Sequence, residues 1–313
     1  MSAMFQTQIA ISHSSDGVRA PEVPGGSGSV VRTDIKSSIR PIGPISSSTP
    51  QHDVVAARAP ARSTLELPLC AERNRPLAIR IGKRLRGVFD RLIATSSLVT
   101  NDPVLDVRDF AWTAPLRENW RAIRDEALAI ALQGDAAPSL ATISPDHRAI
   151  ARVGQWKSFF LSGYGCAIDE NIARCPATAA AVARIPGLNT AVFSILAPGT
   201  HIPDHRGVTK GLLTCHLGLI VPRDGDVRMR IGDRIVRWAE GETLVFDDTY
   251  SHEVWNDTSG TRVVLLIQFA RPLRRPGRIV ADLVLRLIRR SAFVQEARDN
   301  ILIWNETIKK TGA

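Results

Sequence analysis

Long apolar runs are missing from this chain. Its 313 residues are 44% hydrophobic, yet no uninterrupted apolar run reaches the roughly 18 residues that a membrane-spanning helix needs. The first residues also lack the basic region and apolar block that are typical of a secretory signal. We therefore expect no transmembrane segment and a cytoplasmic protein.

Paired cysteines and aromatic clusters are also missing. The four cysteines, Cys70, Cys166, Cys175 and Cys215, lack the spacing of a zinc site or a disulfide framework, which favours free thiols in a reducing compartment. The formal net charge of +9 would suit a nucleic-acid partner. However, Lys and Arg are spread along the chain, aromatic residues are only 5%, and no nucleic-acid-binding motif occurs. We expect no nucleic-acid partner.

Residues 1–66 are dense in Ser, Pro, Gly and Thr. Such a composition buries too little apolar surface to offset its ordering entropy, so it predicts a disordered leader. One interpretation is a dispensable tail. The other is an export signal, because Ser-rich leaders occur in some bacterial secreted effectors.

Helical periodicity flanks a central β-rich region. Apolar positions recur on one face from Leu77 to Leu98, with arginines elsewhere, and a second helix is expected from Pro115 to Leu132. Basic amphipathic helices are also expected over residues 277–290 and from Ser291 onward. We expect a helical part over 67–135, a core over 136–272 and C-terminal helices over 273–313. The helices either pad the outside of the core or rest on an anionic membrane surface.

The core reads as antiparallel β-structure. Apolar, β-branched segments alternate with turns rich in Gly, Asp, Pro and Asn, which predicts a mainly β jelly roll rather than a parallel sheet. The expected strands are 191–196, 212–221, 227–231, 243–246 and 262–269.

Two histidines of this core are candidate metal ligands. His205 is expected in a turn that follows the strand at 191–196, and His252 follows the strand at 243–246. Imidazole suits iron, zinc and copper. A facial triad would have a carboxylate two residues after the first histidine, but Gly207 occupies that position. We expect second-sphere roles for nearby carboxylates, which are those of Asp204, Asp247 and Asp248.

Longer motifs carry a family resemblance. Residues 193–207, 215–222, 238–242 and 246–256, together with Arg262 and the upstream segment 154–156, resemble the aspartyl/asparaginyl β-hydroxylase family in order and spacing. The resemblance covers about half of the chain. It implies a double-stranded β-helix (cupin-like) oxygenase that uses Fe(II), 2-oxoglutarate and O2. Glycine at the position of Gly207 is itself a feature of this family.

The resemblance also assigns roles. His205 and His252 would bind iron, Arg262 and Ser194 would hold the distal carboxylate of 2-oxoglutarate, and His216 would contact its other end. The alternative for His216, which sits among apolar neighbours, is a core histidine with its hydrogen bonds satisfied. Trp156 matches a substrate-side position.

One position departs from the family pattern. Animal members carry a cosubstrate-binding arginine where this chain has Thr214, which could donate a hydrogen bond but no charge. Lys210 and Arg228 are the candidates to compensate for it.

The expected activity is hydroxylation of a C–H bond by a 2-oxoglutarate-dependent dioxygenase. The substrate could be an Asp or Asn residue of a peptide, a carrier-bound amino acid or a lipid-linked acyl group. The alternative is a cupin-like metal-binding or sensor module without turnover. A third hypothesis is a basic surface-binding protein whose leader and helices carry the function.

Overall fold

The computed structural model describes residues 77–144 and 147–311, with side chains from Arg86 onward. The chain divides into two compact units, Met1–Arg62 and Ser63–Ala313, and only the second contains described residues. The leader expected over residues 1–66 lies outside them.

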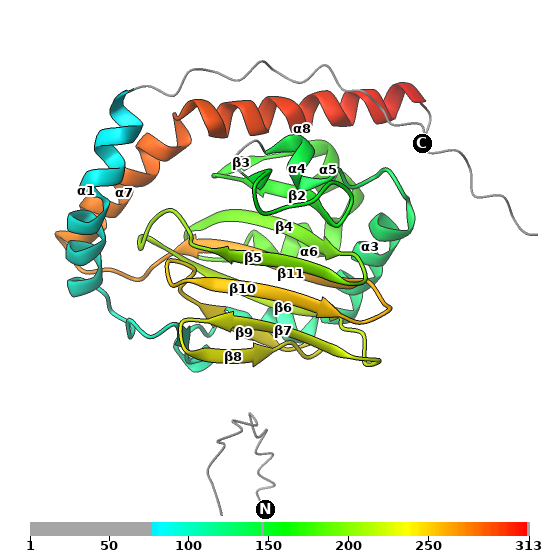
Figure 1. Cartoon of the computed structure of the whole chain (residues 1–313), viewed down its shortest axis with the longest axis horizontal. Coiled ribbons are helices and arrows are strands. Elements are labelled where there is room, and N and C mark those ends of the chain that lie inside the picture. The colour runs from blue at the N-terminus through cyan, green and yellow to red at the C-terminus, as the bar shows by residue number, and fades with distance from the viewer. Residues whose placement is uncertain (1–76, 145–146, 312–313) are drawn as a thin grey trace, which may run out of the picture. The chain divides into compact units, whose positions relative to one another are not determined.

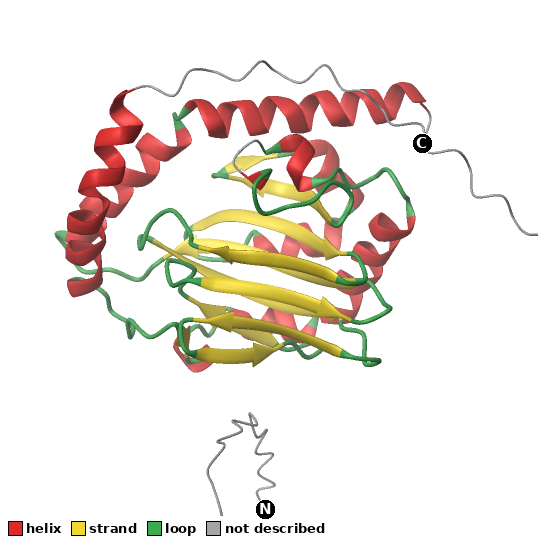
Figure 2. Ribbon diagram, in the orientation of Figure 1, coloured by secondary structure: helices red, strands yellow, loops and turns green. Residues whose placement is uncertain are grey.

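Two antiparallel sheets form the centre of the second unit (Figures 1 and 2). The larger sheet has seven strands in the order β1-β9-β6-β11-β4-β2-β3, and the smaller has four in the order β5-β10-β7-β8. This architecture confirms the expected mainly β jelly roll with flanking helices. The larger sheet contains β1 (Val104–Leu105), β2 (Trp156–Gly163), β3 (Cys166–Ala167), β4 (Leu188–Leu196), β6 (Leu212–Ile220), β9 (Thr243–Phe246) and β11 (Arg262–Ala270). The smaller contains β5 (Thr200–His205), β7 (Asp226–Ile231), β8 (Arg234–Arg237) and β10 (His252–Asp257).

Alternation along the strands separates two apolar cores. On β4, Phe193 and Ile195 belong to a core outside the barrel, whereas Leu196 belongs to the core between the sheets. Because successive side chains point to opposite faces of a strand, Ser194 shares the inward face with Leu196. The outer core is completed by helical residues such as Ile123 and Ala127. Polar residues at inward positions therefore lie inside the barrel.

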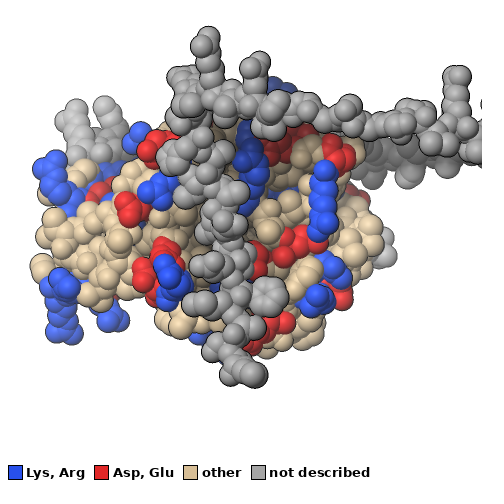
Figure 3. All heavy atoms as spheres, turned by 90° about the horizontal axis from the view of Figure 1, so that it is seen from below, with Lys and Arg blue, Asp and Glu red and all other residues tan. Residues whose placement is uncertain are grey.

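Helices cover the outer face of the larger sheet and one end of the unit (Figure 1). Those behind the larger sheet are α2 (Thr113–Glu118), α3 (Trp120–Leu132), α5 (Asp169–Arg174) and α6 (Pro176–Val182); a 3-10 turn, Val107–Asp109, precedes them. The others are α1 (Leu77–Thr95), α4 (Leu140–Ile143), α7 (Gly277–Arg289) and α8 (Ala292–Thr311). The helices α1 and α7 pack together, and Lys and Arg border the end that they form (left in Figure 3).

Two local expectations were wrong. The single helix expected from Pro115 to Leu132 is broken at Asn119, whose backbone leaves the helical region (φ −97°, ψ 9°) while its side-chain amide donates to the Pro115 carbonyl oxygen (2.8 Å). His205 ends strand β5 instead of lying in a turn. Pro203 hid this strand from the sequence pattern, but β5 lies at a sheet edge, where proline is tolerated.

Candidate active site

The register of two strands places the candidate metal ligands side by side. His205 on β5 pairs with His252 on β10, and their ring centroids are 4.0 Å apart. The His205 Nδ1 lies 2.8 Å from the Pro203 carbonyl oxygen, and the His252 Nδ1 lies 3.0 Å from the Tyr250 carbonyl oxygen. Since a carbonyl only accepts, each Nδ1 carries the proton and donates. Each Nε2 is then left with a lone pair for a metal.

Burial keeps both imidazoles neutral. It lowers the pKa of His205 to about 4, and it also lowers the pKa of His252 below its usual value. Metal binding needs the deprotonated nitrogen, so the pair is ready to bind a cation at neutral pH.

A carboxylate fills the space beside Gly207. A Cβ added at Gly207 would lie 2.0 Å from the Asp248 Oδ1, and the Gly207 N–H donates to the Asp248 carbonyl oxygen (2.7 Å). Thr214 and Gln268 donate to the Asp248 Oδ2 at 3.0 and 3.2 Å, while burial raises the pKa of Asp248 to about 6. Glycine is therefore required sterically. Within residues 77–144 and 147–311, no three His, Cys, Asp or Glu side chains are grouped as a metal site.

Arg262 is a buried cation that lacks a protein anion. It is 2% exposed, burial lowers its pKa to about 9, and the ion pairs found among the described side chains do not include it. Its guanidinium carbon lies 4.4 Å from the Trp238 ring centroid. Its Nε has no hydrogen-bond partner. An unpaired buried charge is costly, so this position is prepared for an anionic ligand.

Ser194 adds a directed donor beside Arg262. Its hydroxyl oxygen accepts from the Trp156 Nε1 (3.1 Å) and the Arg262 Nη1 (3.4 Å). Those contacts use both acceptor lone pairs, which leaves the hydroxyl proton to be donated. Trp156, expected at the substrate side, is buried and contacts this anion-binding corner.

His216 presents a second unused donor. The Trp238 Nε1–H donates to the His216 Nδ1 (3.2 Å), so the neutral ring carries its proton on Nε2. That Nε2 is buried and has no partner. The reading of His216 as a core histidine with its hydrogen bonds satisfied is therefore wrong. The orphaned donors of His216 and Arg262 fit a small molecule with acceptors at both ends, as 2-oxoglutarate has.

A cavity of about 1490 Å³ connects these residues to the helical end of the unit. Its inner part is lined by His205, His252 and Arg262. Its outer part is lined by aliphatic side chains of α7 and α8 and by Phe89 of α1, and also by polar and charged side chains such as Arg289, Arg290 and Gln295. The aliphatic group includes Val284, Leu287, Ile288, Val294, Ile301 and Leu302.

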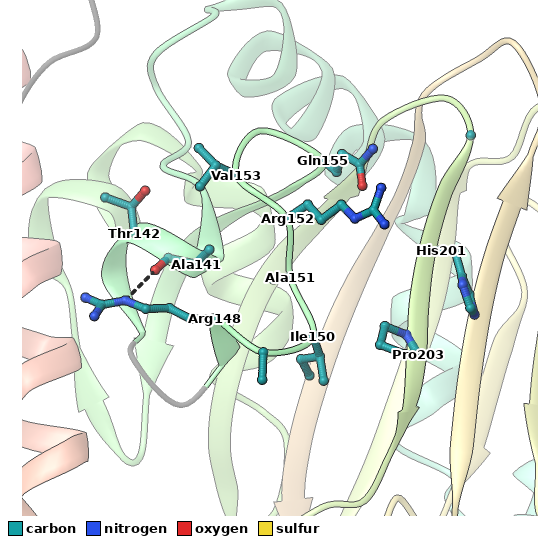
Figure 4. Close-up of a pocket in the computed structure, with 12 residues that line it drawn as sticks. Ala141, Thr142, Arg148, Ile150, Ala151, Arg152, Val153, Gln155, His201 and Pro203 are labelled. Atoms are coloured by element: carbon teal, nitrogen blue, oxygen red, sulfur yellow. Dashed lines mark hydrogen bonds between the residues drawn. The ribbon is translucent and has the colours of Figure 1, made fainter.

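A second cavity, of about 800 Å³, lies outside the smaller sheet along β5 (Figure 4). Arg152 and Gln155 lie on a loop there, facing His201 and Pro203 on the strand. None of the candidate metal or cosubstrate residues lines it. His201 instead lies 2.7 Å from Glu253 and stacks on Trp255.

Helix α1 holds the loop that follows His205. The Arg86 Nη2 donates to the Gly207 carbonyl oxygen (2.5 Å), and the Asp90 Oδ1 accepts the Lys210 backbone N–H (2.9 Å). Arg86 and Asp90 are also paired with each other at 3.2 Å. A helix far from the barrel in sequence thus fixes the backbone beside the candidate metal site.

The candidates to compensate for Thr214 lie elsewhere. Arg228 pairs with Asp226 and Asp257, and Lys210 pairs with Asp247. The residue that sequence reasoning missed is Trp238, which contacts both Arg262 and His216. Its position in the segment 238–242 of the family pattern was the available signal.

Sequence comparison relates the chain to hydroxylases. The profile described as "Aspartyl/Asparaginyl beta-hydroxylase" matches residues 117–272. The "Ornithine lipid ester-linked acyl 2-hydroxylase" of Rhizobium tropici is 43% identical over 207 residues, which cover 66% of this chain and 74% of that protein. The human "Aspartyl/asparaginyl beta-hydroxylase" is 32% identical over 51% of this chain, but only 21% of the human protein is matched.

Comparison with solved structures gives weaker likenesses. A Pseudomonas putida prolyl-4-hydroxylase matches 50% of this chain and 87% of its own, at 19% identity and a TM-score of 0.33. The fold assignment therefore rests on the strand order itself.

Proposed function

This chain belongs to the aspartyl/asparaginyl β-hydroxylase family, and from that premise we propose that it hydroxylates the acyl chain of a lipid-linked substrate. It is an enzyme of the dioxygenase type, and its relatives are named as hydroxylases. The proposed cofactors are Fe(II), 2-oxoglutarate and O2. The observation that carries this proposal is Arg262, a buried cation that pairs with no anion among the described side chains and that lines the same cavity as two neutral histidines.

The chain's residues fit the proposed groups. His205 and His252 would hold the iron through Nε2, because their Nδ1 atoms already donate to carbonyl oxygens. When bound, iron and 2-oxoglutarate supply the oxidation that inserts one atom of dioxygen into a C–H bond, with release of succinate and carbon dioxide.

The cosubstrate would lie between two sets of donors. Arg262 would bind its distal carboxylate through charge-assisted hydrogen bonds, and Ser194 would donate its free hydroxyl proton to the same group. The His216 Nε2–H would donate to the other end. Asp248 would support the loop beside the metal, because its carboxylate occupies the space that a side chain at position 207 would take.

The outer cavity favours an acyl substrate. Aliphatic side chains of α7 and α8 line the route from solvent to His252, and they offer dispersion contacts but no hydrogen bonds. A methylene chain suits the aliphatic part of these walls. The relative from Rhizobium tropici, whose name specifies an acyl 2-hydroxylase, supports this choice of substrate.

We also propose that the enzyme works in the cytoplasm. Cys166, Cys175 and Cys215 are free, as expected in a reducing compartment. In the described part of the chain, no helix is long and apolar enough to cross a bilayer.

Anaerobic titration with Fe(II) and 2-oxoglutarate tests the site. We expect the weak visible charge-transfer band of the chelate in the wild type and in His201→Ala, a matched variant of a histidine that does not line the cavity of His205 and His252. The band should be lost in His252→Ala. Its absence in the wild type at saturating cosubstrate contradicts the cofactor assignment.

Turnover tests the substrate. With an acyl lipid, succinate release should rise above the uncoupled rate, and the lipid should gain the mass of one oxygen atom. Stimulation by an Asp- or Asn-containing peptide, with none by acyl lipids, contradicts the acyl proposal while leaving the cofactor assignment intact.

A further inference from the structure

Aliphatic side chains face solvent on the two helices at the end of the unit. Val88 and Leu92 on α1 are 62% and 37% exposed. On α7, Ile279, Leu283 and Leu287 are 60%, 53% and 61% exposed. We call these five residues the α1–α7 face. They recur at intervals of four, so each helix presents an apolar stripe that the described part of the fold leaves uncovered.

Helix α7 packs against the rest of the unit through a different stripe. Gly277, Ala281 and Leu285 of α7 are buried. A Cβ added at Gly277 would lie 2.3 Å from the Ser96 Cβ, which shows how closely α7 approaches the end of α1. The exposed stripe is therefore additional to what packing requires.

Arginines border the α1–α7 face. Arg91 on α1 is exposed, and so are the arginines on and around α7. Arg278 and Arg286 form no ion pair with any described side chain, and Asp282 is the one acidic residue within α7. Figure 3 shows Lys and Arg around uncharged surface at this end (left). The exposed arginines around α7 are Arg274, Arg275, Arg278, Arg286, Arg289 and Arg290.

The α1–α7 face continues into the cavity. Leu287 belongs to the exposed stripe and also lines the cavity that reaches His252. Phe89 of α1 and Val284 of α7 line the same outer part. Leu302 of α8, 45% exposed, lies on the cavity as well. Aliphatic side chains therefore extend from the α1–α7 face into the cavity that contains the candidate metal site.

We propose that the α1–α7 face docks on a bilayer that carries anionic headgroups. The aliphatic stripes enter the headgroup region while the bordering arginines pair with lipid phosphates, the combination by which amphipathic helices bind an anionic interface. The bilayer is favoured over a protein partner because the arginines that border the face are cationic and the face leads into a largely apolar cavity. Only the further step, delivery of an acyl chain to the cavity, rests on the proposed function.

Vesicle flotation of the full chain tests the docking surface. We expect binding to phosphatidylcholine vesicles that contain phosphatidylglycerol, weaker binding to phosphatidylcholine alone, and loss of binding as salt rises. Ile279→Asp combined with Leu283→Asp should reduce binding at least about tenfold, because charged groups are costly in an apolar environment. Arg278→Gln combined with Arg286→Gln should reduce binding to anionic vesicles only.

Matched control variants distinguish binding through the α1–α7 face from nonspecific vesicle binding by exposed aliphatic side chains. Ile235→Asp on β8 and Leu128→Asp on α3 change aliphatic residues that are also exposed, at 50% and 39%, but lie on other elements. Both should bind like the wild type. Equal binding by the control and test variants, or no wild-type binding to anionic vesicles, overturns the proposal. The proposal is also overturned if the wild type does not bind vesicles but forms a dimer that the double variant Ile279→Asp with Leu283→Asp dissociates.

Binding and catalysis can fail separately. His252→Ala should bind vesicles as the wild type does, since docking needs no iron. If the wild type binds anionic vesicles but never hydroxylates an acyl lipid, the surface stands and the proposed function fails. If it is active, Ile279→Asp with Leu283→Asp should lose activity on lipid in vesicles and keep it on the same lipid dispersed in detergent. Equal loss in both forms overturns delivery through this face.

Discussion

The barrel interior and the helical end differ in how they present functional side chains. In the barrel, Ser194, His216 and Arg262 project from three neighbouring strands of one sheet and are buried. At the helical end, Leu283 and Leu287 project from one amphipathic helix and face solvent. The first region is buried, and its hydrogen-bond donors would suit a small anion. The second is apolar, cationic at its border and suited to a large partner.

The two regions also differ in their relation to the family. The family match, residues 117–272, contains every candidate iron and cosubstrate residue. Helices α1, α7 and α8 lie outside that match yet line the outer cavity. We infer that the barrel determines the chemistry and that helices α1, α7 and α8 contribute to the choice of substrate. Each prediction below tests one side of this division.

Loss of a metal ligand should have the largest effect. His252→Ala removes one of two proposed ligands, so turnover should fall below detection while vesicle binding is unchanged. The measurements are succinate release and flotation. A variant that keeps a tenth of wild-type turnover would remove His252 from the metal site.

Arg262→Met should separate ligand binding from stability. Loss of a buried charge-assisted contact costs about 3–5 kcal/mol, so the KM for 2-oxoglutarate should rise by about a hundredfold or more. The apo-protein should melt at the same temperature or higher, since an unpaired buried charge has been removed. Arg228→Met, in a solvent-facing ion-pair group, should change neither quantity. A much lower melting temperature with unchanged KM would make Arg262 structural.

Gly207→Ala should disturb the Asp248 carboxylate. Its Cβ would overlap Asp248, so the free energy of unfolding should fall by about 1–3 kcal/mol, the usual cost of overpacking. Adding Asp248→Ala should restore much of that stability without restoring turnover. Denaturant titration of the two variants checks this, and equal stability of wild type and Gly207→Ala contradicts it.

Asp90→Ala should have a moderate effect from outside the family match. It removes the acceptor of the Lys210 N–H and the partner of Arg86, which loosens the loop after His205. Supporting contacts of this kind change metal affinity by roughly 10- to 100-fold. We expect weaker Fe(II) binding in the anaerobic titration, with Arg91→Ala on the same helix as the unaffected control.

The pH dependence of apo-protein stability should show two opposing contributions. Folded His205, with a pKa of about 4, binds fewer protons than the unfolded histidine up to about pH 6.5, so its contribution raises stability with pH over that window. Asp248, with a folded pKa of about 6, lowers stability as pH rises from about 4 to 6. His252 and His216, whose pKa values burial also lowers, contribute in the same direction as His205. Denaturant midpoints should therefore rise less steeply with pH in His205→Gln than in the wild type, and more steeply in Asp248→Asn. Parallel profiles would contradict this.

Strand-level features could be predicted where alternation was regular. The expected strand at 243–246 matches β9, and those at 212–221 and 262–269 match β6 and β11 within one residue. The edge strand β5 was missed because its position beside β10, which tolerates Pro203, is a tertiary property. The break at Asn119 was missed because the hydrogen bond from its side-chain amide to the Pro115 carbonyl oxygen cannot be predicted from apolar periodicity.

The site could be assembled from the sequence only through the family resemblance. Spacing suggests that His205 and His252 bind a metal, but not that strand register brings their rings together. The steric reason for Gly207 needs the Asp248 carboxylate, 41 residues away. The hold of Arg86 and Asp90 on the 207–210 loop is equally long-range.

Trp238 gives this site an intrinsic optical signal. Its indole lies under the Arg262 guanidinium and donates to His216, so it senses both ends of the proposed cosubstrate site. A dicarboxylate that draws the guanidinium toward itself changes the electric field at the indole and hence its emission. Among the six tryptophans, the one at 238 should therefore report ligand arrival by fluorescence in the absence of oxygen and substrate. Affinity could be measured before the substrate is identified.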